Sequence, residues 1–243
     1  MRKLAVTGVA GLALALIATV GVALASTSAW PTVTVKPSVT PNKAGTARHP
    51  QAVQLKVGIK WQKLGAANQP VVTQFHVLFP KGSLYEGGKF PTCSVAVLDR
   101  RGPSGCNRGS IMGSGSGIAY ANTTLTEPKI IVVNGGQHAV YFYVELNNPA
   151  RVYEPVIGHI TKQGGKWAYL LSLTVPQNLQ VVAGVPIELT SLNVTAGSSS
   201  KPWLATTSCK GGKWPFSATT TYENYNNNTT AQASYNSSVA CRA

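Results

Sequence analysis

The sequence predicts an all-β protein, an immunoglobulin-like or related β-sandwich of about ten short antiparallel strands. Apolar and polar residues alternate from residue 53 to 62 and again from 71 to 79, which is the period of a strand with one buried face. Asn134-Gly135-Gly136 is a tight hairpin signal between two further apolar segments. We expect no amphipathic helix after the N-terminal segment, which favours a sandwich or a barrel.

Short apolar segments separated by turn residues place the other strands. Residues 94–98 are apolar enough for a short strand, and residues 32–35 could add an edge strand. The main strands are expected at 53–62, 71–79, 111–121, 129–133, 139–146, 152–160, 167–175, 186–194, 203–206, 214–222 and 230–239.

The N-terminus has the pattern of an export signal. Met1-Arg2-Lys3 is positive, residues 4–24 are apolar and uncharged, and Ala23-Leu24-Ala25 fits signal peptidase. We expect residues 1–25 to be a signal peptide and the protein to be secreted or associated with the cell surface. The apolar run is also long enough to span a bilayer, so a retained anchor is the alternative, and membrane contact is expected only in that case.

Residues 26–50 are rich in Pro, Thr and Lys and are predicted to be an extended spacer. The globular domain is expected to cover residues 51–243. About 190 residues are enough to bury a substantial core without the help of a metal ion.

The four cysteines predict two disulfide bonds, because the chain has an export signal and the count is even. Cys106 closes a loop onto Cys93, and Cys209 and Cys241 bracket the last hairpin. In the chain-entropy model, a loop of about thirteen residues closed in this way stabilises the fold by roughly 3 kcal/mol.

The run Gly113-Ser114-Gly115-Ser116-Gly117 resembles two catalytic motifs but fits neither. A phosphate-binding loop needs a following lysine and a helix, whereas an apolar strand-like segment follows here. A nucleophile elbow needs Gly two residues on each side of the serine, and neither serine satisfies this. Glycines inside a strand indicate a bulge or a close approach of two backbones, and we expect that role here.

The chain is strongly basic. It has 21 Lys and Arg against 7 Asp and Glu, and without Arg2 and Lys3 the balance is 19 against 7, or +12. Such a field attracts polyanions in general. Because the basic residues are dispersed, we expect cell-wall polymers or acidic polysaccharide as possible partners and no specific nucleic acid.

Residues that could carry chemistry are scarce. His49, His76, His138 and His159 are far apart in sequence, so no metal site and no cofactor are expected. Glu145 and Glu154 flank a turn and could approach one another as a glycosidase requires, although surface ion pairs are the simpler expectation. We therefore predict that the protein is not an enzyme.

Exposed aromatic rings are the candidates for glycan binding, because an apolar ring stacks on a sugar face. The candidates are Trp203, Tyr225 and Tyr235, with Trp30 as a further one. Trp61, Trp167 and Trp214 lie at strand positions and are expected in the core.

Several loop and cysteine motifs together resemble a group of uncharacterised exported two-disulfide β-domain proteins of soil actinobacteria and related lineages. The resemblance covers residues 52–241 and implies an exported β domain with two disulfides, without implying any catalytic residue. The motifs are Pro91-Thr92-Cys93-Ser94, Gly102-Pro103 with Cys106, Gly113-Ser114-Gly115, Asn134-Gly135-Gly136, Ser208-Cys209 with Gly212-Lys213-Trp214, and Cys241.

These observations favour a non-catalytic exported β-sandwich that acts as a structural or adhesive module at the cell wall or outside the cell. A carbohydrate-binding module is the alternative, and it requires aromatic rings that converge on one exposed face. An extracellular hydrolase of an unrecognised type is the second alternative, and it requires a cleft with two close carboxylates or a Ser–His pair.

Overall fold

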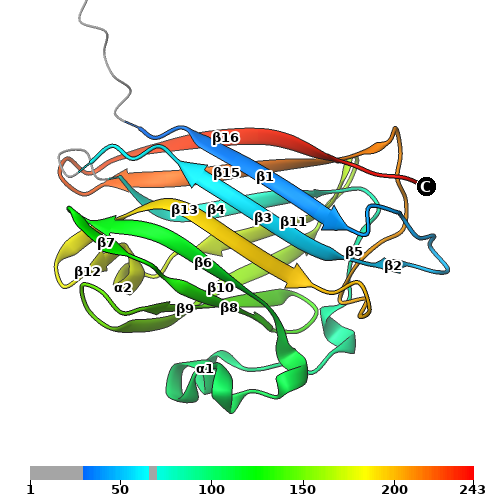
Figure 1. The fold of residues 1–243 in the computed structure, drawn as a ribbon, viewed down its shortest axis with the longest axis horizontal. Helices are drawn as coiled ribbons and strands as arrows, with labels where there is room; N and C mark the ends of the chain where they lie inside the picture. The colour runs from blue at the N-terminus through cyan, green and yellow to red at the C-terminus, as the bar shows by residue number, and fades with distance from the viewer. Residues whose placement is uncertain (1–29, 66–69) are drawn as a thin grey trace, which may run out of the picture.

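Strands make up most of the structure, a computed structural model that describes residues 30–65 and 70–243 (Figure 1). The predicted signal peptide lies outside the described residues. The strands of the main sheet are β1 (Val33–Thr40), β3 (Gln54–Trp61), β4 (Pro70–Pro80), β6 (Ile111–Ala121), β7 (Thr124–Thr126), β8 (Lys129–Asn134), β9 (Ala139–Leu146), β10 (Val152–Lys162), β11 (Trp167–Thr174), β12 (Val181–Val182), β13 (Val185–Gly197), β15 (Lys213–Asn224) and β16 (Thr229–Ala240).

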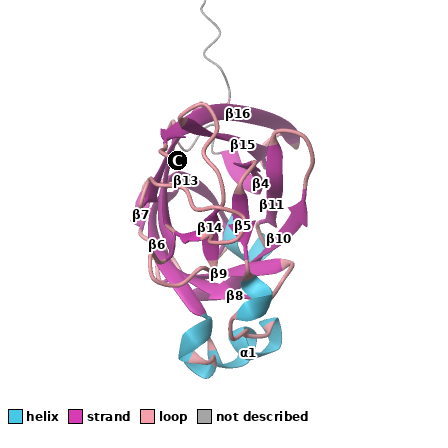
Figure 2. Ribbon diagram, turned by 90° about the vertical axis from the view of Figure 1, so that its right-hand side faces the viewer, coloured by secondary structure: helices cyan, strands magenta, loops and turns pink. Residues whose placement is uncertain are grey.

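The main sheet follows one continuous path, β1-β3-β13-β6-β8-β9-β10-β11-β4-β15-β16, and every neighbouring pair on it is antiparallel. The path curls round until its first and last strands lie side by side (Figures 1 and 2). The all-β prediction is confirmed. The predicted β-sandwich is not confirmed, because the strands form one barrel-like sheet instead of two facing sheets.

The barrel-like sheet closes between β1 and β16. Backbone hydrogen bonds run from Arg242 N to Asn42 O (2.8 Å) and from Ala44 N to Arg242 O (2.7 Å), just beyond the ends of the two strands. Lys43 and Arg242 form a parallel bridge there. β1 contains Pro37, which cannot donate a ladder hydrogen bond and is tolerated on an edge strand. The sheet is therefore nearly closed.

The predicted spacer contains the strand β1, which is longer than the edge strand expected at 32–35. Val33, Val35 and Val39 of β1 are buried, and the whole strand pairs with β3 in an unbroken register. This alternation was hidden in a segment rich in Pro and Thr. The folded body therefore begins near Val33 rather than at residue 51.

A second, three-stranded sheet lies inside one end of the ring (Figure 2). Its strands are β2 (Gln51–Ala52), β14 (Leu204–Thr206) and β5 (Ser83–Tyr85). Two further backbone bonds extend it, from Val53 N to Leu204 O and from Glu86 N to Trp203 O, each 2.9 Å long. We call this end of the molecule the small-sheet end.

The segment after Cys93 is helical and not a strand. α1 (Val95–Arg101) begins at Ser94, whose side chain accepts a hydrogen bond from Val97 N, and it ends at Gly102 with a φ of 61°. Leu98 is fully buried against Val133 and Tyr143, so α1 covers the outer face of β8 and β9. Three single turns surround it in sequence: η2 (Gly87–Lys89), η3 (Pro103–Gly105) and η4 (Arg108–Ser110).

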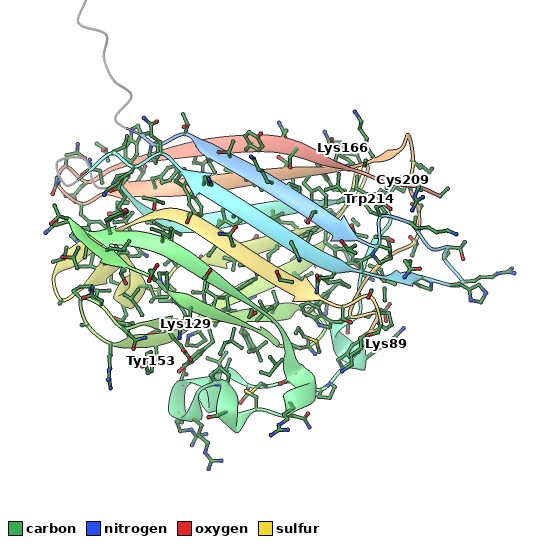
Figure 3. The ribbon with its side chains drawn as sticks, in the orientation of Figure 1. Lys89, Lys129, Tyr153, Lys166, Cys209 and Trp214 are labelled. Carbon is green, nitrogen blue, oxygen red and sulfur yellow. A yellow bond between two sulfur atoms is a disulfide. The ribbon has the colours of Figure 1, made fainter. Side chains whose placement is uncertain are left out.

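Both predicted disulfides are confirmed. Cys93 pairs with Cys106 at a Cα–Cα distance of 5.5 Å, and Cys209 pairs with Cys241 at 5.9 Å. The second bond fastens the end of β16 beside the start of β15, where Trp214 is buried (Figure 3). Two disulfides indicate an oxidising environment.

The opposite end of the barrel-like sheet carries α2 (Gln177–Gln180), a single turn between β11 and β12. We call it the α2 end. In the described part of the chain, no helix is both long and apolar enough to cross a membrane.

Candidate functional site

The interior of the barrel-like sheet contains a cavity of about 280 Å³. Alternate residues of the strands point into it, such as Val57, Ile59 and Trp61 of β3 and Val132 of β8. This alternation is the one that the sequence shows from residue 53 to 62. Eight strands make a ring that side chains just fill, so a path of eleven strands leaves room inside.

Three glycines of β6 lie beside residues of the cavity wall. Gly113, Gly115 and Gly117 stand opposite Ala196, Val194 and Leu192 of β13, which line the cavity. Side chains directly opposite one another on antiparallel strands share a face, so the three glycines also face inward. We call Gly113, Gly115 and Gly117 the glycine strip. It places no side chain on the inner face of β6.

The glycine strip also allows two backbones to approach closely. A Cβ atom added to Gly113 or Gly115 would collide with the carbonyl oxygens of Thr195 or Asn193 on β13. The register shifts between Ile111 and Gly113, which marks a bulge at the start of β6. The predicted role of these glycines, a bulge or a close backbone approach, is confirmed.

At the small-sheet end the cavity is closed by two aromatic rings. Tyr85 and Trp203 pack edge to face, with their ring centroids 5.3 Å apart. The Tyr85 hydroxyl donates to the backbone oxygens of Ala139 (2.7 Å) or Gly136 (2.8 Å), and Trp203 Nε1 donates to Asn134 Oδ1 (3.1 Å). Burial raises the pKa of Tyr85 well above its ordinary value. The polar atoms of both rings are thus bonded to the protein.

Asn134 is the centre of this closure, and it is fully buried. Its Oδ1 accepts from Trp203 Nε1 and Gly136 N, while its Nδ2 donates to the backbone oxygens of Gly87 (2.8 Å) and Pro91 (3.0 Å). From the sequence, Asn134 was identified only as part of a hairpin turn. Its partners are up to 69 residues away along the chain, so no local pattern could identify its role.

At the α2 end the closure involves α2 and the last hairpin. Leu179 of α2 lines the cavity. Gln180 is buried, with its Nε2 donating to Val175 O (2.6 Å) and its Oε1 accepting from the Tyr225 hydroxyl (2.7 Å). Tyr225 comes from the tip between β15 and β16, so the last hairpin helps to hold α2 in place.

The cavity is lined almost entirely by apolar side chains. In the described residues, its wall is made of aliphatic and aromatic side chains, with Ser83 as the exception, and carries no charged group. An ion would lose its hydration there without a compensating partner. The cavity therefore suits a neutral, largely apolar molecule.

The three residues predicted to bind glycans are not brought together. Trp203 is only 2% exposed and forms part of the small-sheet end, so it presents no face to a sugar in solvent. Tyr225 lies at the other end, bonded to α2. Tyr235 of β16 packs on the cluster that contains Val33 and Trp61. Trp61 and Trp214 are buried, as expected.

The two carboxylates considered for hydrolysis lie on opposite faces of the sheet. Glu154 of β10 stands opposite Val144 of β9, which lines the cavity, whereas Glu145 stands opposite the exposed Tyr153. Glu154 Oε2 accepts a hydrogen bond from Asn178 of α2. The register therefore does not bring the two carboxylates together as a catalytic pair.

One acid is buried, but outside the cavity. Glu188 of β13 is 1% exposed, and its neighbours Ile187 and Leu189 line the cavity, so Glu188 points to the outer face. Its Oε1 accepts from Leu64 N (2.5 Å). Within residues 30–65 and 70–243, no three His, Cys, Asp or Glu side chains are grouped so that they could hold a metal ion.

The sequence matches no known protein-family model and no curated protein.

Proposed function

We propose that this protein is a non-catalytic binding protein that holds a small apolar molecule inside its barrel-like sheet, outside the cytoplasm. The observation that carries this proposal is the 280 Å³ apolar cavity. The two disulfides support an oxidising, extracellular setting.

The energetic cost of the cavity supports a ligand. Protein interiors ordinarily leave few voids larger than a water molecule. On the scale of large-to-small substitutions, about 24 cal/mol per Å³, an empty cavity of this size costs about 7 kcal/mol. That is comparable to the whole stability of an ordinary domain, about 5–15 kcal/mol. A bound apolar molecule restores the lost packing contacts.

The volume sets the size of the ligand. A 150 Å³ apolar cavity holds one benzene molecule, so by proportion a 280 Å³ cavity holds about eleven carbon atoms. Naphthalene is close to this size, while benzene leaves space unfilled and pyrene exceeds it.

A titration with these three hydrocarbons tests the proposal. The protein, with both disulfides formed, is titrated by calorimetry and by tryptophan fluorescence, because Trp61 and Trp203 line the cavity. We expect naphthalene to bind most tightly, benzene more weakly, and pyrene not measurably. Equal binding of all three would indicate a surface interaction, and no binding of naphthalene would refute the proposal.

A second candidate function, adhesion to acidic wall polymers, is favoured by three exposed lysines on one outer face. Lys56 and Lys60 alternate with the inward Val57 and Ile59 on β3, and Lys36 of β1 stands opposite Gly58 between them. The three ammonium groups thus share one face of two neighbouring strands. Such a face attracts polyanions in a salt-dependent way.

Retention on purified cell walls tests this second candidate. We expect the wild-type protein to bind at low salt and to be released as salt rises, and the variant K36Q/K56Q/K60Q to bind more weakly. Retention that neither salt nor the triple substitution alters would exclude this face as the adhesive surface.

A further inference from the structure

We propose that α2 is a lid through which the apolar ligand enters and leaves the cavity, and that the Tyr225 hydroxyl holds this lid closed. The inference rests on the proposed function and adds an entry route and a gating residue to it. The route leads through the α2 end, which lies at the opposite end of the barrel-like sheet from β2 and β5 (Figure 1).

α2 is a thin barrier between the cavity and solvent. Leu179 lines the cavity, whereas Gln177 and Asn178, on the same single turn, are exposed to solvent. One turn of helix therefore separates the apolar interior from water at this point. Outward movement of this turn would open the cavity.

The chain is fixed on both sides of α2, so the turn can move as a unit. On its N-terminal side, Val175 N donates to Thr73 O of β4 (2.9 Å), and on its C-terminal side β12 pairs with β13. Within the turn, Leu179 N and Gln180 N both donate to Pro176 O. These internal bonds can persist when the turn moves away from the sheet.

Side-chain hydrogen bonds join α2 to its neighbours. The Tyr225 hydroxyl donates to Gln180 Oε1 (2.7 Å) or Gln177 Oε1 (3.2 Å), and Asn178 Nδ2 donates to Glu154 Oε2 of β10 (3.2 Å). A single hydrogen bond makes only a modest net contribution to stability when water can replace the lost partner. Opening α2 therefore requires the loss of a few weak contacts.

The small-sheet end offers no comparable route. Its strands are joined by backbone hydrogen bonds, including those from Val53 N to Leu204 O and from Glu86 N to Trp203 O. Opening this end would break bonds between several strands, together with the buried bonds of Asn134. We therefore place the entry route at the α2 end.

Tyrosine-to-phenylalanine variants test the lid, because they remove one hydroxyl and keep the ring. Tyr225→Phe removes the bond to α2. Tyr153→Phe is the matched control, since the Tyr153 hydroxyl donates to Asn147 Oδ1 (2.8 Å) and its ring is exposed on the outer face of β10. Asn178→Ala removes the other side-chain bond of α2 to the sheet.

The measurements separate rates from affinity. Stopped-flow tryptophan fluorescence gives the association and dissociation rate constants of naphthalene, because Trp61 and Trp203 line the cavity. Calorimetry gives the dissociation constant. Both are carried out on the protein with both disulfides formed.

We expect Tyr225→Phe to raise both rate constants about three- to tenfold, the value of one hydrogen bond, and to leave the dissociation constant unchanged. The bond is present in the closed free protein and in the closed complex, so its loss favours the open lid in both and cancels in the affinity. Asn178→Ala should raise both rate constants as well, and Tyr153→Phe should behave like the wild type.

Unchanged rate constants in Tyr225→Phe, or an equal increase in Tyr153→Phe, would refute the lid while the cavity stands as the binding site. Faster dissociation alone in Tyr225→Phe, with weaker affinity, would also refute it, because Tyr225 would then stabilise only the complex. If naphthalene does not bind to the wild-type protein, the proposed function fails and this inference fails with it.

Discussion

The buried side-chain amide of Asn134 connects three separate parts of the fold. It joins the β8–β9 turn to the Gly87–Pro91 segment and to Trp203 of the small-sheet end, three parts of the chain that are distant in sequence. Each bond satisfies a polar atom of the Asn134 side chain, which is fully buried. The residue therefore stabilises the closure of the cavity without contributing apolar surface.

Replacing Asn134 by alanine should lower the free energy of unfolding by about 3 kcal/mol or more. The indole Nε1 of Trp203 would be left buried without its partner, and the backbone oxygens of Gly87 and Pro91 would each lose a hydrogen bond. A buried polar group that loses its partner costs about 1–3 kcal/mol. Urea denaturation measures the change. Asn236→Ala, on the exposed face of β16, is the control and should change stability by less than about 0.5 kcal/mol. A loss below about 1 kcal/mol for Asn134→Ala would contradict the role given to this residue.

Tyr222 should make stability depend on pH in alkaline solution. Burial raises the pKa of Tyr222 to about 12, and nearby Thr220 and Trp61 oppose this shift. An unfolded tyrosine loses its proton near pH 10, so the stabilisation is fully present below pH 10 and is lost as pH rises toward 12. Tyr85 shifts in the same direction and adds to the effect.

The variant Tyr222→Phe, which has no proton to lose, isolates this contribution. Its free energy of unfolding, measured by urea denaturation between pH 8 and pH 12, should fall less steeply above pH 10 than that of the wild type. The values below pH 9 serve as the internal reference. Parallel pH profiles for the two proteins would show that Tyr222 does not contribute.

At the scale of the strand, β13 supplies side chains to the cavity wall and β6 packs closely against it. β6 presents the glycine strip, and β13 presents Leu192, Val194 and Ala196 opposite it. The side chain of Ala196 is small and lines the cavity, so it has unfilled space in front of it. A larger side chain at position 196 can occupy the volume that the ligand needs.

Ala196→Leu should therefore abolish naphthalene binding while keeping or raising stability. Each added methylene that becomes buried contributes about 0.8 kcal/mol, so a gain of about 1–2 kcal/mol in the free energy of unfolding is expected. Calorimetry and urea denaturation measure the two effects. Asn193→Leu, on the exposed face of the same strand, is the control and should bind naphthalene like the wild type. Undiminished binding by Ala196→Leu would place the ligand elsewhere.

For the molecule as a whole, the two disulfides have different consequences. The Cys93–Cys106 bond closes a loop with a sequence separation of 13 around α1, on the outside of the sheet. The Cys209–Cys241 bond has a separation of 32 and fastens the strand that completes the ring. Chain entropy predicts that the longer loop stabilises more, about 4 kcal/mol against about 3 kcal/mol.

Substituting each cysteine pair by serine tests this difference. C209S/C241S should lose more stability than C93S/C106S in urea denaturation, and it should also lose naphthalene binding because β16 is no longer fastened. C93S/C106S should keep the binding, since α1 lies outside the cavity. Greater loss of stability, or loss of binding, in C93S/C106S would contradict this assignment of roles.

Local features of the sequence were enough to place most strands and both disulfides. Strict alternation located β3 and β4, and the apolar segments between turns located β6 and β9 at their observed limits. The helix α1 was missed, because the apolar residues at 94–98 suit a strand as well as a helix and the cap at Ser94 decides between them. β1 was largely missed because Pro37 and several threonines hid the alternation of its valines.

The cavity, by contrast, could not be predicted from local features. Alternation shows that one face of each strand is buried, but two facing sheets and one curled sheet bury the same residues. The choice depends on which edges meet, here β1 with β16, and on how many strands the ring contains. The role of Asn134 depends on partners that are distant in sequence. The strands depend on residues close together in the chain. The hollow interior depends on contacts between the first and last strands of the ring, because only the closed ring determines how much space the inward side chains leave.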